Sequence, residues 1–267
     1  MTTLKPRKQL TELQQEILEI LYKFRFATIE LIGKYQELES TVYTYKRLKL
    51  LEAKKLIGRK YDGNYRIHGK SATYYLLKDG IKKLKTDPDF STTALNGMYK
   101  DGTVKDKFIE ECLSIFQLYV KFVEIYGETM SFNTKNEITE SDYFPRPLPD
   151  AYITLKPKNG DTKQYMLEIL EDTPRFSKNR SRIFRYIVHY KDKDSTEQKG
   201  YPTILLVCEN SYLERRVQRQ TARTMDQEEI IGLTINTTTT KALMASNSPK
   251  DIIWSDVNDP DELISLL

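Results

Sequence analysis

The chain has few of the residues that mark secreted or zinc-binding proteins, and it has no long apolar run. Its 267 residues include two cysteines, two histidines and one tryptophan. Cys112 lies in a helical pattern and Cys208 in a strand pattern, so we expect two reduced core residues and no zinc site. No segment approaches the roughly 18–20 apolar residues of a membrane helix, and residues 1–9 lack the apolar stretch of a secretory signal. These absences predict a cytoplasmic protein with no membrane partner.

Charge is distributed unevenly along a chain long enough for about two domains. Residues 1–90 contain 19 Lys and Arg against 11 Asp and Glu, a net charge of +8. The remainder contains 23 against 27, a net charge of −4. A basic N-terminal third suggests contact with a polyanion, although solvated lysines that only confer solubility are about as common.

Composition and hydrophobic patterning divide the chain into four segments. A flexible basic tail is expected at 1–9, a first domain at 10–85, and a linker rich in Pro, Ser and Thr at 86–102. The second domain, at 103–267, is expected to begin with a long helix that ends before Gly127.

The first domain has the pattern of three helices followed by two strands. Each helical segment carries a threonine or serine that can cap its first turn, and a polar, glycine-bearing hairpin tip separates the strands. This order is that of a winged helix-turn-helix. We expect helices at 10–21 with Thr11 as cap, at 27–32 with Thr28, and at 41–53 after Ser40; strands at 56–60 and 72–77; and the hairpin tip at 61–70.

The third helix and the hairpin are the candidate interface with double-stranded DNA. Such a helix packs one face on its neighbours and presents the other to the major groove, while the wing reaches backbone phosphates. A purely protein-binding role with a solvated basic face is the alternative. We expect Val42, Tyr45, Leu48 and Leu51 to face inward; Thr41, Tyr43, Thr44, Lys46 and Arg47 to face the DNA; and Arg59, Lys60, Arg66 and Lys70 to line the wing.

The second domain shows alternating strands and helices, so the fold class is α+β or α/β. The order strand, hairpin, strand, helix, strand, helix resembles the core of PD-(D/E)XK nucleases, that is, a restriction-endonuclease-like domain. Asn159-Gly160 is a strong hairpin signal between the second and third strands. Strands are expected at 130–132, 151–155, 165–170, 203–208 and near 230–235, and helices at 177–190 and 212–224.

Two carboxylates occupy the places that this resemblance assigns to metal ligands. It implies that Asp150 and Glu168 hold Mg²⁺ in an active member, with a lysine two residues after the glutamate. The chain has Leu170 there, and Lys178 on the following helix is the nearest lysine that could serve as a third catalytic residue. Arg180 or Arg182 could supply positive charge. We therefore expect a degenerate nuclease domain that is not an enzyme and needs no cofactor; Mg²⁺ enters only if the site is active.

The helix at 177–190 and the residues just before it carry a basic face that could track a DNA backbone. The alternative is a solvated surface whose cations pair with Glu171 and Asp172. The face consists of Arg175, Lys178, Arg182, Arg185 and His189.

A wider pattern resembles the replication-relaxation family. It comprises Pro149-Asp150-Ala151, the run from Met166 to Thr173, the basic helix ending at Tyr190, and Pro202 with the strand after it. The resemblance spans about 10–208, and where the family has a Glu-x-Asp-x-Gly-Thr-like run this chain reads Glu-Ile-Leu-Glu-Asp-Thr. It implies a plasmid or mobile-element protein with an N-terminal winged helix.

The expected function is double-stranded DNA binding in replication initiation, DNA relaxation or mobilisation. A homodimer, or a relaxase or replication protein, is the expected protein partner. Two alternatives stay open: a Mg²⁺-dependent endonuclease that uses Asp150 and Glu168, and a winged-helix transcriptional regulator whose second domain binds a protein or a small ligand.

Overall fold

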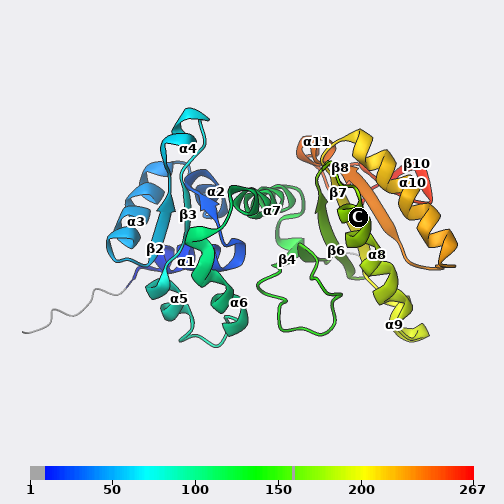
Figure 1. Cartoon of the computed structure of the whole chain (residues 1–267), viewed down its shortest axis with the longest axis horizontal. Helices are drawn as coiled ribbons and strands as arrows, with labels where there is room; N and C mark the ends of the chain where they lie inside the picture. Colours follow the sequence, from blue (N-terminus) through cyan, green and yellow to red (C-terminus); the bar gives the residue numbers. More distant parts are fainter. Residues whose placement is uncertain (1–9, 158–159) are drawn as a thin grey trace, which may run out of the picture. The chain divides into compact units, whose positions relative to one another are not determined.

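The computed structural model describes residues 10–157 and 160–267, and the chain forms two compact units that divide after Gln117 (Figure 1). The expected basic tail at 1–9 and Asn159 of the expected hairpin lie outside the described residues. No helix within the described ranges is long and apolar enough to cross a membrane.

The first unit begins with the three helices α1 to α3 and contains a small antiparallel sheet of order β1-β3-β2. The first turn of each helix is capped as expected: the Thr11, Thr28 and Ser40 hydroxyls each accept a backbone N–H bond, at 3.3, 3.4 and 3.3 Å. The winged helix-turn-helix identification itself stays a prediction. The elements are α1 (Glu12–Phe24), β1 (Ala27–Thr28), α2 (Ile29–Tyr35), α3 (Thr41–Ala53), β2 (Ile57–Lys60) and β3 (Thr73–Leu76).

Two segments of this unit differ from the expectation. The connection between β2 and β3, expected as a plain hairpin tip, contains the short helix α4 (Gly63–Ile67). Residues 92–102, expected within the linker, belong to α6 (Thr92–Gly97) and to the 3-10 helix η1 (Met98–Thr103), which follow α5 (Lys78–Leu84). Leu95 and Met98 are buried in the first unit, which is why a segment with the composition of a linker is ordered.

The long helix α7 (Asp106–Tyr126) ends before Gly127, as expected. Gly127 has a φ of +53°, the left-handed conformation that commonly ends a helix. In the first unit Phe116 stacks on Phe24 with ring centroids 4.0 Å apart. In the second unit Phe122 packs near Phe132.

The second unit is built on a seven-stranded mixed sheet of order β10-β9-β8-β7-β6-β5-β4. Strands β6, β7 and β8 are parallel, and the remaining pairs are antiparallel. The coarse expectation of a mixed α and β fold is confirmed. The strands are β4 (Met130–Thr134), β5 (Ala151–Leu155), β6 (Lys163–Leu170), β7 (Thr203–Cys208), β8 (Ile235–Thr239), β9 (Trp254–Asp256) and β10 (Asp259–Ile264).

The parallel strands are joined by two crossover helices on one face of the sheet (Figure 1). Connections of this kind have one preferred hand, so successive helices return to the same face. Ile183 and Val217 from the two helices enter the same apolar cluster as Met166 from the sheet. The crossover helices are α8 (Ser177–Lys191) and α10 (Ser211–Gln227); the shorter helices are η2 (Gly127–Thr129), α9 (Ser195–Lys199) and α11 (Thr240–Ala245).

The strand expected near 230–235 was placed too early in the chain. Glu229 and Gly232 have φ angles of +54° and +89°, so the backbone turns there and β8 begins at Ile235. The side chains of Asn236, Thr237 and Thr238 in β8 are polar and buried. A strand of this kind is not recognised from the alternation of apolar residues.

Candidate functional site

Strands β5 and β6 place the two predicted carboxylates side by side. Asp150 directly precedes β5, and its N–H donates to the Leu167 carbonyl of β6 at 2.9 Å. Successive side chains of a strand alternate between its faces, so Glu168 points to the same face as Met166 and Leu170, the face that α8 covers. Asp150 is 5% exposed and Glu168 is fully buried.

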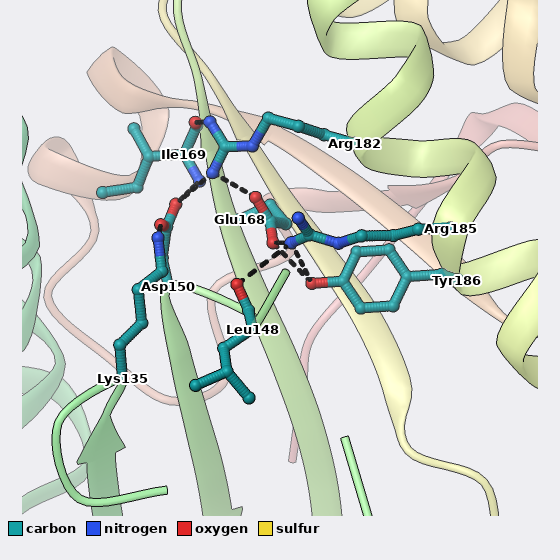
Figure 2. Close-up of polar contacts among 8 residues, drawn as sticks. All are labelled: Lys135, Leu148, Asp150, Glu168, Ile169, Arg182, Arg185 and Tyr186. Carbon is teal, nitrogen blue, oxygen red and sulfur yellow. Dashed lines mark hydrogen bonds and ion pairs between the residues drawn. The ribbon is translucent and has the colours of Figure 1, made fainter. Parts of the chain in front are cut away.

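Three cations surround these two carboxylates (Figure 2). The Arg182 guanidinium lies between them: its Nη2 is 2.7 Å from Asp150 Oδ2 and also contacts Glu168 Oε2. Lys135, which follows β4, pairs with Asp150 Oδ1. Arg185 pairs with Glu168 Oε1. We call these five residues the acid–arginine cluster.

Hydrogen bonds complete the acid–arginine cluster. The Ile169 N–H donates to Asp150 Oδ2 at 2.9 Å, and the Tyr186 hydroxyl donates to Glu168 Oε1 at 2.5 Å. Arg182 and Arg185 also donate to backbone carbonyls, those of Ile169 at 2.9 Å and Leu148 at 3.2 Å. Each carboxylate oxygen therefore has a donor or a cation beside it, which buried charges require.

The surroundings set the protonation state of two groups. Burial alone would raise the pKa of Asp150, but the charges of Lys135 and Arg182 outweigh it, and the pKa lies below its ordinary value. Burial raises the pKa of Tyr186 strongly. Asp150 is thus an anion and Tyr186 a neutral hydrogen-bond donor at neutral pH.

The donor set of the cluster does not fit Mg²⁺. A divalent cation bound by both carboxylates would have to stand where the Arg182 guanidinium lies, with the charges of Lys135 and Arg185 beside it. In the described part of the chain, no group of three or more His, Cys, Asp or Glu side chains is arranged to hold a metal ion.

The predicted third catalytic residue is not part of this cluster. Lys178 is exposed in the first turn of α8, and no hydrogen bond or ion pair within the described residues joins it to either carboxylate. Leu170, in the place of the lysine, is fully buried in the apolar cluster under α8. Sequence reasoning missed Lys135 and Tyr186, because Lys135 is 15 residues away from Asp150 and Tyr186 lies in an ordinary amphipathic pattern.

The basic face expected on α8 is divided in the structure. Arg175 and Lys178 are exposed, whereas Arg182 and Arg185 turn inward. Arg182 and Arg185 pair with Asp150 and Glu168, whereas the alternative expectation placed their partners at Glu171 and Asp172. His189 shares a hydrogen bond of 2.7 Å with the Tyr201 hydroxyl.

The residues of α3 that face the core of the first unit differ from the expected set. Leu48 and Leu51 are buried as expected, but Thr44, expected to face DNA, is fully buried, while Val42 and Tyr45 are 55% and 45% exposed. Thr44 lies on the side of α3 that packs against α2, beside Gly33. The buried residues of α3 are therefore Thr44, Leu48 and Leu51.

The outward side of α3 carries aromatic and basic side chains. Tyr43 is 62% exposed, and the Lys46 amine lies 5.5 Å from the centre of its ring. Lys49 lies 5.6 Å from the ring of Tyr45. Thr41 is exposed too, and Arg47 is half-buried. We call the exposed residues Thr41, Tyr43, Tyr45, Lys46 and Lys49 the α3 face.

The four wing cations differ in their surroundings. Arg59 is exposed and lies 4.8 Å from the ring centre of Tyr61, and Arg66 on α4 is exposed. Lys60 and Lys70 pair instead with the side chains of Asp106 and Glu110 on α7, each at 2.6 Å. Hydrogen bonding to these carboxylates raises the pKa of both lysines.

No protein-family model and no curated protein matches the chain. Among solved structures it is similar to restriction endonuclease FokI bound to DNA, with 13% identity and a TM-score of 0.32 over 91% of this chain and 45% of that chain. A second structure of FokI matches at 11% identity and a TM-score of 0.32, over 89% and 44%. The chain spans less than half the length of either. Because these TM-scores are low, the function proposed below rests on the residues of this chain.

Proposed function

We propose that the protein binds double-stranded DNA through α3 as the recognition helix of a winged helix-turn-helix. The observation that carries the proposal is the α3 face, where Tyr43 and Lys46 stand exposed together. Such groups can meet phosphates and base edges in a major groove. The order of helices and strands in the first unit and the net charge of +8 over residues 1–90 support this.

The second unit is proposed to be a restriction-endonuclease-like domain that does not cleave DNA. Leu170 stands in the place of the lysine, and Arg182 holds both carboxylates. A guanidinium cannot deliver a metal-activated water, so the acid–arginine cluster is a structural element. Together with the resemblance to the replication-relaxation family, this favours a plasmid or mobile-element protein acting in replication initiation, DNA relaxation or mobilisation.

A Mg²⁺-dependent endonuclease is the second candidate. It is favoured by one observation, the side-by-side placement of Asp150 and Glu168 on adjacent strands. Cleavage through this pair would require Arg182 to leave it, because both carboxylates are occupied.

The DNA-binding proposal is tested by a mobility-shift titration with a pool of random-sequence duplexes. The variant Tyr43→Ala/Lys46→Ala leaves the half-buried Arg47 in place, so that packing is preserved. We expect its affinity to fall roughly tenfold or more, and the slope of log affinity against log salt to shrink by about 1.

The matched control is Tyr99→Ala/Lys82→Ala. It removes one exposed tyrosine and one exposed lysine of the same unit from outside α3. Equal loss in the control and the α3 variant would show that only overall charge matters, and an α3 variant that binds like the wild type would refute the proposal. Circular dichroism of each variant confirms that the unit is folded.

A further inference from the structure

A groove of about 650 Å³ runs along α8 in the second unit, and Arg185 of the acid–arginine cluster is among the residues that line it. Helix α10 forms one wall, and residues from the segment before β5 border the other side. The volume lies within the roughly 300–1,000 Å³ usual for ligand sites. We call it the α8 groove, and the residues used below are Arg146, Arg180, Phe184, Val188, Gln220 and Thr224.

The middle of the α8 groove is apolar and accessible. Phe184 is 40% exposed and Val188 is 42% exposed, one helical turn apart on α8. The core side of the helix, with Ile183 and Ile187, is buried separately, so Phe184 is not needed to fill the core. An accessible aromatic side chain beside an aliphatic one offers a surface on which a flat ring can stack.

Two exposed arginines line the groove. Arg146 donates to the Thr139 and Ser141 carbonyls at 3.1 and 2.9 Å, which hold the guanidinium without neutralising it. Arg180 is exposed, and within the described residues it forms no ion pair. A guanidinium is a good hydrogen-bond partner for a phosphate group.

The part of the groove near the C-terminal ends of α8 and α10, and the wall that α10 forms, have different chemistry. Asp192 and Glu228 line the groove near the C-terminal ends of α8 and α10, and Glu228 is paired with Lys191 at 2.9 Å. On the wall, the Thr224 hydroxyl donates to the Gln220 carbonyl at 2.8 Å. The Gln220 amide can both donate and accept hydrogen bonds, as the edge of a nucleobase requires.

We infer that the α8 groove binds single-stranded nucleic acid. A base stacks on Phe184, its edge meets Gln220, and a neighbouring phosphate lies on Arg146 and Arg180. Stacking on Phe184 needs a base whose face is free, which a paired duplex does not offer, so the single strand is the form that fits. The inference goes beyond the proposed function, because it concerns a second site, on the other unit, for another form of nucleic acid.

The test is fluorescence anisotropy of a fluorescein-labelled oligo(dT), which forms no duplex, with the full chain. Phe184→Ala should weaken binding roughly tenfold, while Phe184→Trp keeps it. Arg180→Ala should weaken binding and reduce the salt slope by about 0.7. Tyr212→Ala and Arg219→Ala are matched controls, since both are exposed residues of α10 outside the groove and should bind like the wild type.

The result separates this inference from the DNA-binding proposal. Tyr43→Ala/Lys46→Ala should bind oligo(dT) like the wild type although it loses duplex binding. A wild type that binds duplex but not oligo(dT), or a Phe184→Ala variant that binds oligo(dT) no more weakly than Tyr212→Ala, overturns the inference and leaves the proposed function standing. If Phe184→Ala weakens oligo(dT) binding but Tyr43→Ala/Lys46→Ala leaves duplex binding unchanged, the inference stands and the proposed function is overturned.

Discussion

Replacing Arg182 by methionine should destabilise the second unit strongly. Methionine keeps much of the length of the side chain but removes the cation that contacts both Asp150 and Glu168. Breaking a buried ion pair by removing one partner typically costs about 3–5 kcal/mol, because the remaining charge is left buried. Arg185 still pairs with Glu168, and the Arg182 side chain is 32% exposed, so we expect about 3 kcal/mol, the lower end of that range.

The assay is urea unfolding followed by tryptophan fluorescence. Trp254 is the only tryptophan in the sequence and is fully buried in the second unit, so its emission reports that unit alone. Arg219→Met removes an exposed arginine and should change the free energy of unfolding by less than about 0.5 kcal/mol. Adding Glu168→Gln to Arg182→Met should not recover the loss but deepen it, because Arg185, whose side chain is 10% exposed, then loses its carboxylate partner.

Two results would refute this reasoning. An Arg182→Met variant as stable as Arg219→Met would mean that the ion pairs contribute nothing to the fold. A double variant with Glu168→Gln that is more stable than Arg182→Met alone would mean that Arg185 does not need the carboxylate of Glu168.

Three further perturbations have defined outcomes. The pKa of Asp150 is lower in the folded than in the unfolded protein, so the stability that Asp150 contributes is complete above its unfolded pKa and is lost as the pH falls through its folded pKa. Asp150→Asn should therefore reduce the loss of stability at acidic pH in unfolding measurements followed by Trp254 fluorescence. An unchanged loss of stability at acidic pH would contradict this. Gly80→Ala should destabilise the first unit by about 1–3 kcal/mol, since its Cβ would lie 2.2 Å from the Leu56 carbonyl oxygen. Gly97→Ala is the control, because the position has open space around it. If the two variants had the same melting temperature by circular dichroism, the clash with the Leu56 carbonyl would not be the cause. Thr11→Ala removes a capping box and should cost about 1 kcal/mol in the same melts, whereas no loss would show that the cap is dispensable.

Local signals in the sequence predicted several elements closely. Ser40 sets the start of α3, and apolar, β-branched runs define β5 and β7 at their expected bounds. Such elements depend on caps and on short runs of neighbouring residues, which one sequence displays.

Features that depend on distant contacts were missed. Helix α3 has apolar residues around most of its circumference, so its pattern alone does not reveal that Thr44 is the buried residue; the packing of α2 against this side of α3 decides it. Nothing near Asp150 in the sequence indicates Lys135 as its partner, and Arg182 was expected only as a residue that could supply positive charge, not as the cation that contacts both carboxylates. Strands β9 and β10 lie at the edge of the sheet, and β10 carries exposed, acidic residues that do not resemble a strand.

The most direct test of the account is to incubate the full chain with supercoiled plasmid and Mg²⁺ or Mn²⁺ and to examine binding and cleavage on the same gel. We predict that the wild type retards the plasmid, that Tyr43→Ala/Lys46→Ala needs roughly tenfold more protein or more for the same shift, and that no nicked or linear product remains after the protein is removed. Nicking by the wild type that disappears in both Asp150→Ala and Glu168→Ala would contradict the account and assign catalysis to the acidic pair.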